Sequence, residues 1–123
     1  MQRTFLLAGA LAGFVGVAFG AFGAHGLRGR LSPDMLAVFE TGVRYQMYHA
    51  LALMLTAAIM MTGRIESART LTVAGWSFVA GIVLFSGSLY LLAVTGITSL
   101  GAITPIGGLL FLVGWACLVV AML

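Results

Sequence analysis

The sequence predicts an all-α fold: a polytopic membrane protein with four transmembrane helices bundled in one domain over residues 1–123. Two observations carry this prediction. The chain is 62% hydrophobic and only 7% charged, whereas soluble domains carry about 25% charged residues. Its apolar residues also fall into four runs, and each run has about the 20 residues that a helix needs to cross roughly 30 Å of hydrocarbon.

The first run, residues 4–24, carries glycines at alternating steps of four and three. These are Gly9, Gly13, Gly16, Gly20 and Gly23. Such a seam lies along one face of a helix and lets another helix approach closely. The run follows Arg3 and ends in small residues, which resembles a secretory signal. It is longer than a usual signal core, so we expect a retained helix.

The second helix is predicted to begin at Ser32-Pro33-Asp34, because serine caps a helix, proline fits its first turn and an acid suits its positive end. Residues 33–43 read as a short amphipathic segment, which lies at the interface or forms the lower end of this helix. The membrane crossing then runs from about 44 to 62. Glu40 and Arg44 are spaced for a helical ion pair.

Two further helices are predicted over residues 71–95 and 104–123, separated by a polar loop at 63–70 and a short uncharged turn at 96–101. Four crossings place both termini on one side. The arginines are almost evenly divided between the two sides, so they do not decide the membrane orientation.

The alternating direction of the helices predicts that the unusual polar residues gather in one half of the bundle. Tyr45, Gln46 and His49 share one face of the second helix. The complete candidate polar site comprises His25, Arg44, Tyr45, Gln46, His49, Ser86, Ser88, Tyr90 and Thr104. Two interpretations stay open: a site for a small ligand, ion or proton, or interhelical hydrogen bonds that hold the helices together.

No enzymatic activity, metal or cofactor is predicted. His25 and His49 could meet at adjacent helix ends, but two imidazoles without a third ligand are thin evidence for zinc, and glycine packing would close a haem pocket. Cys117 is the single cysteine and cannot form an internal disulfide. No catalytic motif is present. The net charge of +3 comes from scattered arginines, which excludes nucleic acid as a partner.

Four stretches resemble the domain-of-unknown-function 423 family: GAFGAHGL at 20–27, YQMYHAL at 45–51, FSGSLY at 85–90 and TPIGG at 104–108. The family comprises small bacterial inner-membrane proteins related to the mitochondrial transmembrane protein 256. The resemblance implies a four-helix, multi-pass protein of the cytoplasmic membrane and carries no established activity. Small multidrug exchangers and fluoride channels do not fit, because the first helix has no glutamate and the chain has no asparagine.

Three functional hypotheses follow. The first is a non-enzymatic membrane protein that acts through helix packing in the lipid bilayer, as a homo-oligomer or as an accessory component of a larger membrane complex. The second is a transport or channel protein whose path is lined by Gln46, His49 and Ser88. The third is a redox, haem or metal-binding membrane protein that uses His25 and His49.

Overall fold

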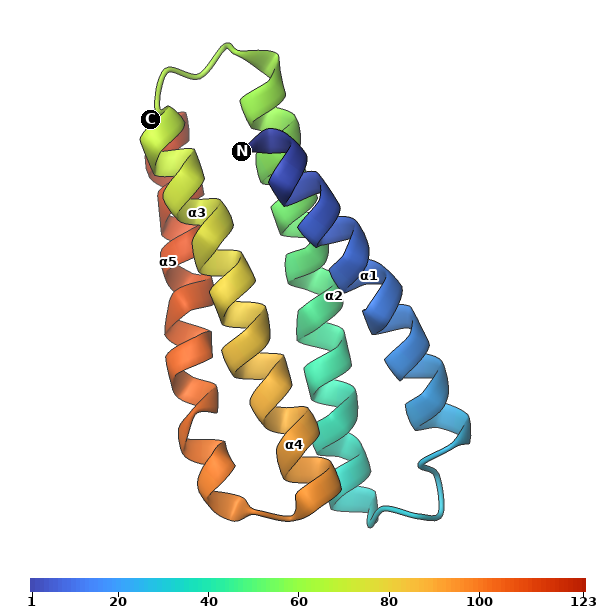
Figure 1. Cartoon of the computed structure of the whole chain (residues 1–123). Coiled ribbons are helices and arrows are strands. Elements are labelled where there is room, and N and C mark those ends of the chain that lie inside the picture. Colours follow the sequence, from blue (N-terminus) through green and yellow to red (C-terminus); the bar gives the residue numbers. More distant parts are fainter.

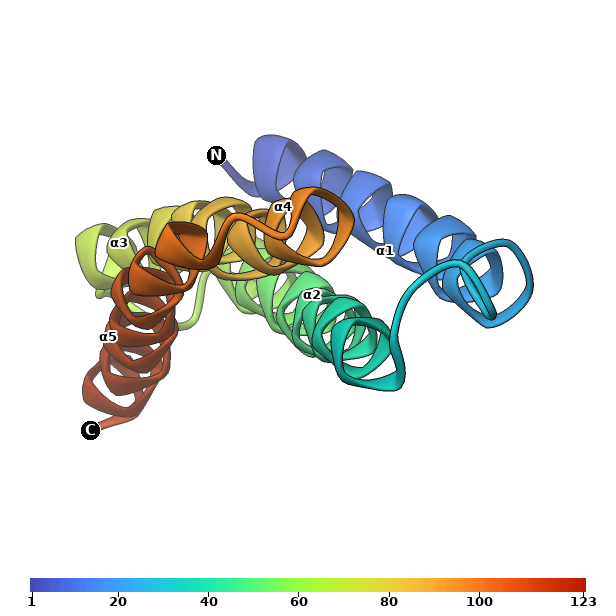
Figure 2. The ribbon, with the colours of Figure 1, turned by 90° about the horizontal axis from the view of Figure 1, so that it is seen from below.

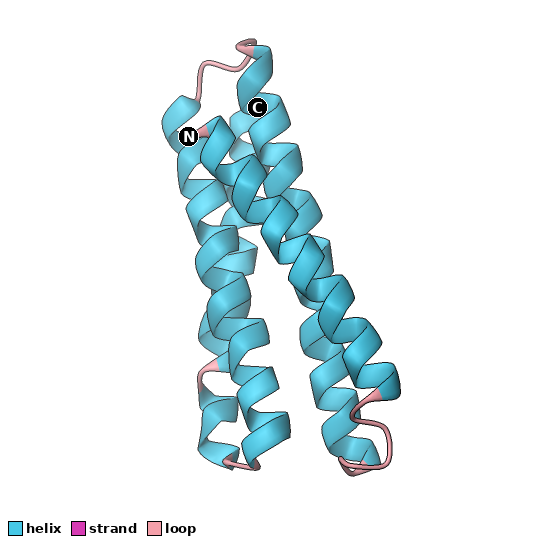
Figure 3. Ribbon diagram, turned by 45° about the vertical axis from the view of Figure 1, so that its right-hand side comes forward, coloured by secondary structure: helices cyan, strands magenta, loops and turns pink.

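The computed structural model describes residues 1–123, and all its regular elements are helices (Figure 1). In chain order they are α1 Gln2–His25, α2 Pro33–Thr62, α3 Ala68–Gly81, the π-helix η1 Ile82–Ser86, α4 Gly87–Thr95, the 3₁₀-helix η2 Thr98–Ala102 and α5 Thr104–Met122. Loops occupy the two ends of the bundle (Figure 3). The termini lie at the same end, and the prediction of an all-α fold is confirmed (Figure 1).

The ends of α2 follow from local chemistry. The Ser32 hydroxyl accepts a hydrogen bond from the backbone N–H of Met35 at 3.2 Å, and Pro33 occupies the first turn. At the other end Gly63 adopts a left-handed conformation with φ of 63°, which glycine reaches without a Cβ clash. The predicted amphipathic segment at 33–43 is the first third of this single helix of 30 residues.

The predicted helix at 71–95 is one continuous helical rod, but it is not α-helical throughout. The α-helical turns of α3 give way to the π-helix η1 before α4 resumes them. A π-helical turn widens the helix by one residue and rotates the side chains that follow it. The turn ends at Ser86, which is fully buried against α2.

The helices are arranged around α2. Seen along the bundle, α1 and α5 lie on opposite sides, with α2 and the α3–α4 rod between them (Figure 2). α1 packs mainly on α2, and α5 packs mainly on α3. α2 also contacts α3, η1 and α4, so it is the helix that joins the two halves of the molecule.

Three stretches are long and apolar enough to cross a membrane: Gln2–His25, Ala68–Thr95 and Thr98–Met122. α2 is longer than any of them but is not in this set. Its first turns carry Asp34, Glu40 and Arg44, and its middle carries Gln46 and His49. These side chains lower its mean hydropathy.

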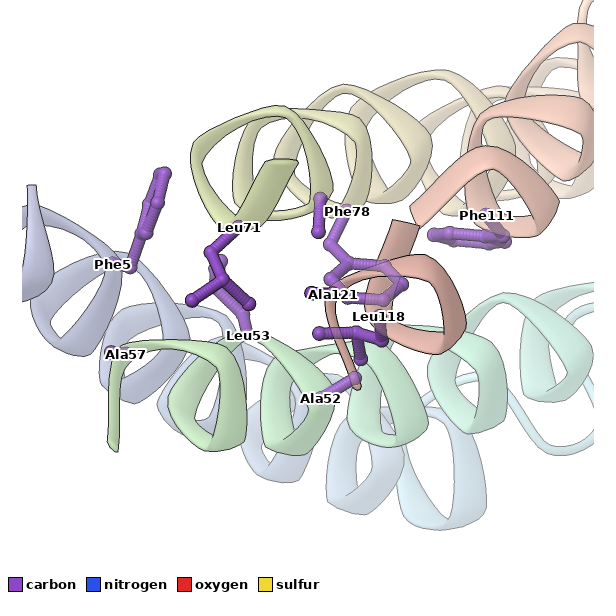
Figure 4. Close-up of a cluster of buried hydrophobic side chains, with 10 residues drawn as sticks. Phe5, Ala52, Leu53, Ala57, Leu71, Phe78, Phe111, Leu118 and Ala121 are labelled. Atoms are coloured by element: carbon purple, nitrogen blue, oxygen red, sulfur yellow. The ribbon is translucent and has the colours of Figure 1, made fainter. Parts of the chain in front are cut away.

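The apolar core fills the half of the bundle near the termini, where ten buried side chains from all the long helices meet (Figure 4). Aromatic rings in this core lie directly on glycines of the neighbouring helix. Phe5 of α1 lies on Gly75 of α3, and Phe78 of α3 lies on Gly114 of α5. Because a glycine has no side chain, each ring contacts the facing backbone and the helices approach closely.

Candidate functional site

The predicted polar residues lie in the other half of the bundle, and Gln46 links three helices there. Its Nε2 donates to the backbone oxygen of Ala12 in α1 at 2.8 Å. Its Oε1 accepts from the hydroxyl of Tyr90 in α4 at 2.6 Å. The residue is only 4% exposed. One amide side chain therefore connects α2 to both of its neighbours.

His49 uses both ring nitrogens within the protein. The indole Nε1–H of Trp115 lies 3.1 Å from His49 Nε2, and because an indole N–H can only donate, Nε2 accepts. Nδ1 lies 2.7 Å from the backbone oxygen of Tyr45 and must therefore carry the proton. The imidazole is thus neutral in this arrangement. It stacks on Phe111, with ring centroids 3.5 Å apart.

The hydroxyl residues make two further links. Ser86 Oγ donates to the backbone oxygen of Gly42 in α2 at 2.6 Å. Ser88 Oγ lies 2.6 Å from Thr104 Oγ1, which joins α4 to α5. Ser88 Oγ also donates to the backbone oxygen of Phe85 at 2.8 Å, so Thr104 is the donor in the pair.

These polar side chains gather in one half of the bundle, as expected, but they do not form one connected cluster. Gln46 and Tyr90 do pair, but His49, Ser86 and Ser88 each take a different partner. The links are separate because each hydrogen bond crosses a different pair of helices. Two of the partners, the Trp115 indole and the Ala12 carbonyl, carry no signal in the sequence that would single them out.

The tyrosines hold positions in aromatic groups. Tyr90 lies against Phe19 and Phe39, with centroids 5.0 and 4.9 Å away. Tyr45 is 37% exposed and packs on Phe85 at 4.8 Å. Tyr45 therefore belongs to the outer surface, and only its backbone oxygen takes part in the polar links.

His25 and Arg44 lie apart from the buried links. Both side chains are exposed. α1 runs antiparallel to α2 so that Gly23 faces Phe39, ten residues before His49 and about 15 Å from it along the helix. The expectation that His25 and His49 could meet is therefore wrong. Nowhere in the chain do three His, Cys, Asp or Glu side chains gather as metal ligands.

Four of the five seam glycines face α2. A Cβ added at Gly9, Gly16 or Gly23 would press on Met54, Met47 or Phe39, and one at Gly20 would touch Val43. Gly13 is different, because a Cβ there would have no neighbour within 4 Å. It lines an apolar groove of about 470 Å³ between α1 and α2. Gly13 is thus the one glycine of the seam at which α1 does not pack closely on α2.

The buried polar atoms are completely paired. No buried side-chain nitrogen or oxygen lacks a hydrogen-bond partner. Such pairing is what a structural network requires, because an unpaired polar group in an apolar interior is costly. Each of these buried atoms therefore has at least one partner within the protein.

Comparison with known proteins places the chain in a family. Residues 19–108 match the family model described as a protein of unknown function, DUF423. The chain belongs to the DUF423 family. It is 49% identical over 120 residues to the UPF0382 membrane protein YwdK of Bacillus subtilis, covering 98% of this chain and 96% of that one. It is 50% identical over 120 residues to the UPF0382 membrane protein SH2409 of Staphylococcus haemolyticus, with 98% and 95% covered.

The DUF423 match spans the whole stretch from Gln46 to Thr104 in which the predicted polar links lie. Trp115 and Ala12, the two partners that sequence reasoning missed, fall outside the matched residues. No solved structure matches the chain. The relatives are named as membrane proteins, in agreement with the three apolar helices.

Proposed function

We propose that this chain is a multi-pass protein of the bacterial cytoplasmic membrane that crosses the bilayer four times. It acts without catalysis, through helix contacts, as a homo-oligomer or as an accessory component of a larger membrane complex. The crossing by α2 is supported by the placement of its polar residues. Gln46 and His49 are 4% and 5% exposed, so these two polar side chains in the middle of α2 do not face lipid. Residues 45–62 carry no charge and span about 27 Å.

One observation supports the proposal that the protein acts without catalysis: both ring nitrogens of His49 already take part in hydrogen bonds within the protein. A metal or haem ligand needs an imidazole nitrogen with a free lone pair, and the lone pair of Nε2 already accepts from Trp115. The other buried polar side chains in this half are likewise hydrogen bonded. A transport path needs polar groups that solute or water can reach at successive depths, and the terminal half of the bundle offers mainly the apolar core.

The outer surface supports action through helix contacts. Only 29 of the 123 residues are buried, and many large apolar side chains are exposed on the outside of the bundle. On α5 the outward side chains Ile106, Leu109, Leu112 and Val113 follow one another at steps of three, three and one, and each is 44% to 65% exposed. We take this row as the surface through which α5 packs against another membrane helix by van der Waals contact.

Cysteine cross-linking in membranes tests the proposal. Leu109→Cys and Leu112→Cys would be made in a Cys117→Ser background, which removes the single native cysteine. An oligomer that uses α5 gives a disulfide dimer with at least one of the two variants. The matched control is Leu55→Cys on the outer face of α2, which is 51% exposed.

An accessory role gives a different product, because the same cysteines then cross-link to another membrane protein of defined mass. Cross-linking at neither position and a monomeric mass in mild detergent and in bilayer discs contradict the proposal. A solute flux through liposomes that is lost in His49→Ala, with the fold kept, would instead establish transport.

A further inference from the structure

A second groove, which carries charge, follows the groove at Gly13 along α2. The second groove, of about 300 Å³, lies between α1 and α2 toward the first loop, and Glu40 and Arg44 line it. On α2 the lining residues of the two grooves form one row at steps of four and three, namely Glu40, Val43, Met47, Leu51 and Met54. Residues at this spacing share one face of a helix. The two grooves therefore follow one another along the same face of α2, and together they are here called the α1–α2 furrow.

The inner part of the α1–α2 furrow is apolar. Eight of its ten lining residues are hydrophobic, and Gly13 leaves its floor open. Along α2 the distance from Arg44 to Met54 is about 15 Å. One leaflet of a bilayer has a hydrocarbon thickness of about 15 Å, half of the full core. The furrow is thus as long as one leaflet is deep.

The outer part offers one positive and one negative group. Glu40 and Arg44 are both exposed, and the structure contains no ion pair between them although they are four residues apart. The chain between 45 and 62 is uncharged, so Arg44 marks the level at which α2 leaves the hydrocarbon. An arginine at this level contacts lipid phosphate readily.

We propose that the α1–α2 furrow binds one phospholipid with a zwitterionic phosphoethanolamine headgroup. An acyl chain lies over Gly13, between Met47 and Met54. The phosphate contacts the guanidinium of Arg44, and the ammonium donates hydrogen bonds to the carboxylate of Glu40. A purely anionic headgroup satisfies Arg44 but meets repulsion at Glu40. A choline headgroup has no N–H to donate to that carboxylate.

Titration of delipidated protein, followed by native mass spectrometry, tests this site. The probes are phosphatidylethanolamine, phosphatidylglycerol and phosphatidylcholine with identical acyl chains. The wild type is expected to bind phosphatidylethanolamine tightest. Arg44→Gln lowers the affinity for all three about tenfold, because each loses a charge-assisted contact to its phosphate. Glu40→Gln removes the preference for ethanolamine over glycerol and keeps the phosphate contact.

Gly13→Leu fills the apolar part of the furrow and is expected to weaken all three lipids alike. Its matched control is Gly87→Leu in α4. Gly87 also has open space around it and lines an apolar groove of about 280 Å³, but that groove has no charged residue. Gly87→Leu therefore leaves the lipid affinities unchanged.

Two results would overturn the inference. Equal binding of the three lipids, unchanged in Arg44→Gln and Glu40→Gln, means ordinary boundary lipid only. A change of oligomeric mass in Gly13→Leu with unaltered lipid binding means that a second copy of the chain fills the furrow. Arg44 and Glu40 are exposed and unpaired, so their variants report even where Gly13→Leu does not fold. The outcome of the lipid titration does not depend on whether the α5 cysteines cross-link, so the two proposals can fail separately.

Discussion

The indole of Trp115 donates a hydrogen bond to His49 across 66 residues of sequence, at 3.1 Å. This bond decides the tautomer of the imidazole, because an indole offers only a donor. It also joins α5 to α2, two helices that meet as well through aromatic packing between His49, Phe111 and Trp115. The histidine that sequence reasoning marked as a candidate ligand is thus a hydrogen-bonded part of the bundle.

Removing the indole donor is expected to destabilise the protein. Trp115→Phe keeps an aromatic ring but leaves Nε2 of His49 buried without a partner, which costs about 1–3 kcal/mol. Thermal unfolding in mild detergent, followed by circular dichroism, measures the loss. Trp76→Phe is the control, because Trp76 is 45% exposed and contacts Phe5 by its ring edge. Equal losses in both variants would show that the hydrogen bond contributes nothing.

The pair Gln46 and Tyr90 is expected to be energetically coupled. Gln46→Met and Tyr90→Phe each remove one partner of the 2.6 Å bond between them. A double-mutant cycle then gives a coupling of about 0.6 kcal/mol, with about 1.7 kcal/mol as the upper range for such bonds in membrane proteins. Thr56→Ala combined with Tyr90→Phe serves as the uncoupled comparison, because the Thr56 hydroxyl bonds within its own helix, to the backbone oxygen of Ala52. Strictly additive effects for Gln46 and Tyr90 would contradict the pairing.

Two helix glycines are expected to respond to alanine in opposite ways. At Gly114 the new Cβ would lie 2.5 Å from a ring carbon of Phe78, and such overpacking costs about 1–3 kcal/mol. At Gly13 it meets nothing within 4 Å. There alanine only restricts the unfolded chain and stabilises by about 0.4–1 kcal/mol. Unfolding measurements on both variants under one condition check the difference in sign.

The adjacent glycines at the start of α5 offer a sharper contrast. A Cβ at Gly107 would lie 2.8 Å from the Cα of Phe85 in the π-helix, and backbone cannot move aside as a side chain can. A Cβ at Gly108 would meet only the edge of the Phe85 ring, at 3.9 Å. Gly107→Ala is therefore expected to lower the yield of folded protein severalfold, as measured by fluorescence-detected gel filtration. Gly108→Ala should match the wild type.

Sequence reasoning recovered most of the helix positions. The first helix was predicted at 4–24 and runs over Gln2–His25, and the last was predicted from 104 and begins there. The cap at Ser32 was also predicted and is present. These features are local, since they depend on apolar run length, on turn residues and on the chemistry of the first turn. The π-helix at Ile82–Ser86 had no local signal.

The sequence predicted which residues make up the candidate site, but it did not predict their hydrogen-bond partners. Gln46, His49, Ser86 and Ser88 are buried in one half of the bundle, as the alternating helix directions require. Their partners could not be derived, because a hydrogen bond between helices depends on the rotation and register of both. Backbone oxygens at Ala12 and Gly42 accept two of the bonds, and every residue of a helix has such an oxygen.

By itself the sequence determined that this chain is helical, that it belongs in a membrane and that its unusual polar side chains gather in one half of the bundle. Composition, periodicity and the alternating direction of successive helices suffice for these, because they need no knowledge of how the helices pack. Only the tertiary structure decided that α2 is central, that His49 pairs with Trp115 and that Gly13 stays open. Those facts depend on how helices distant in sequence are set against one another, and close packing allows few such arrangements.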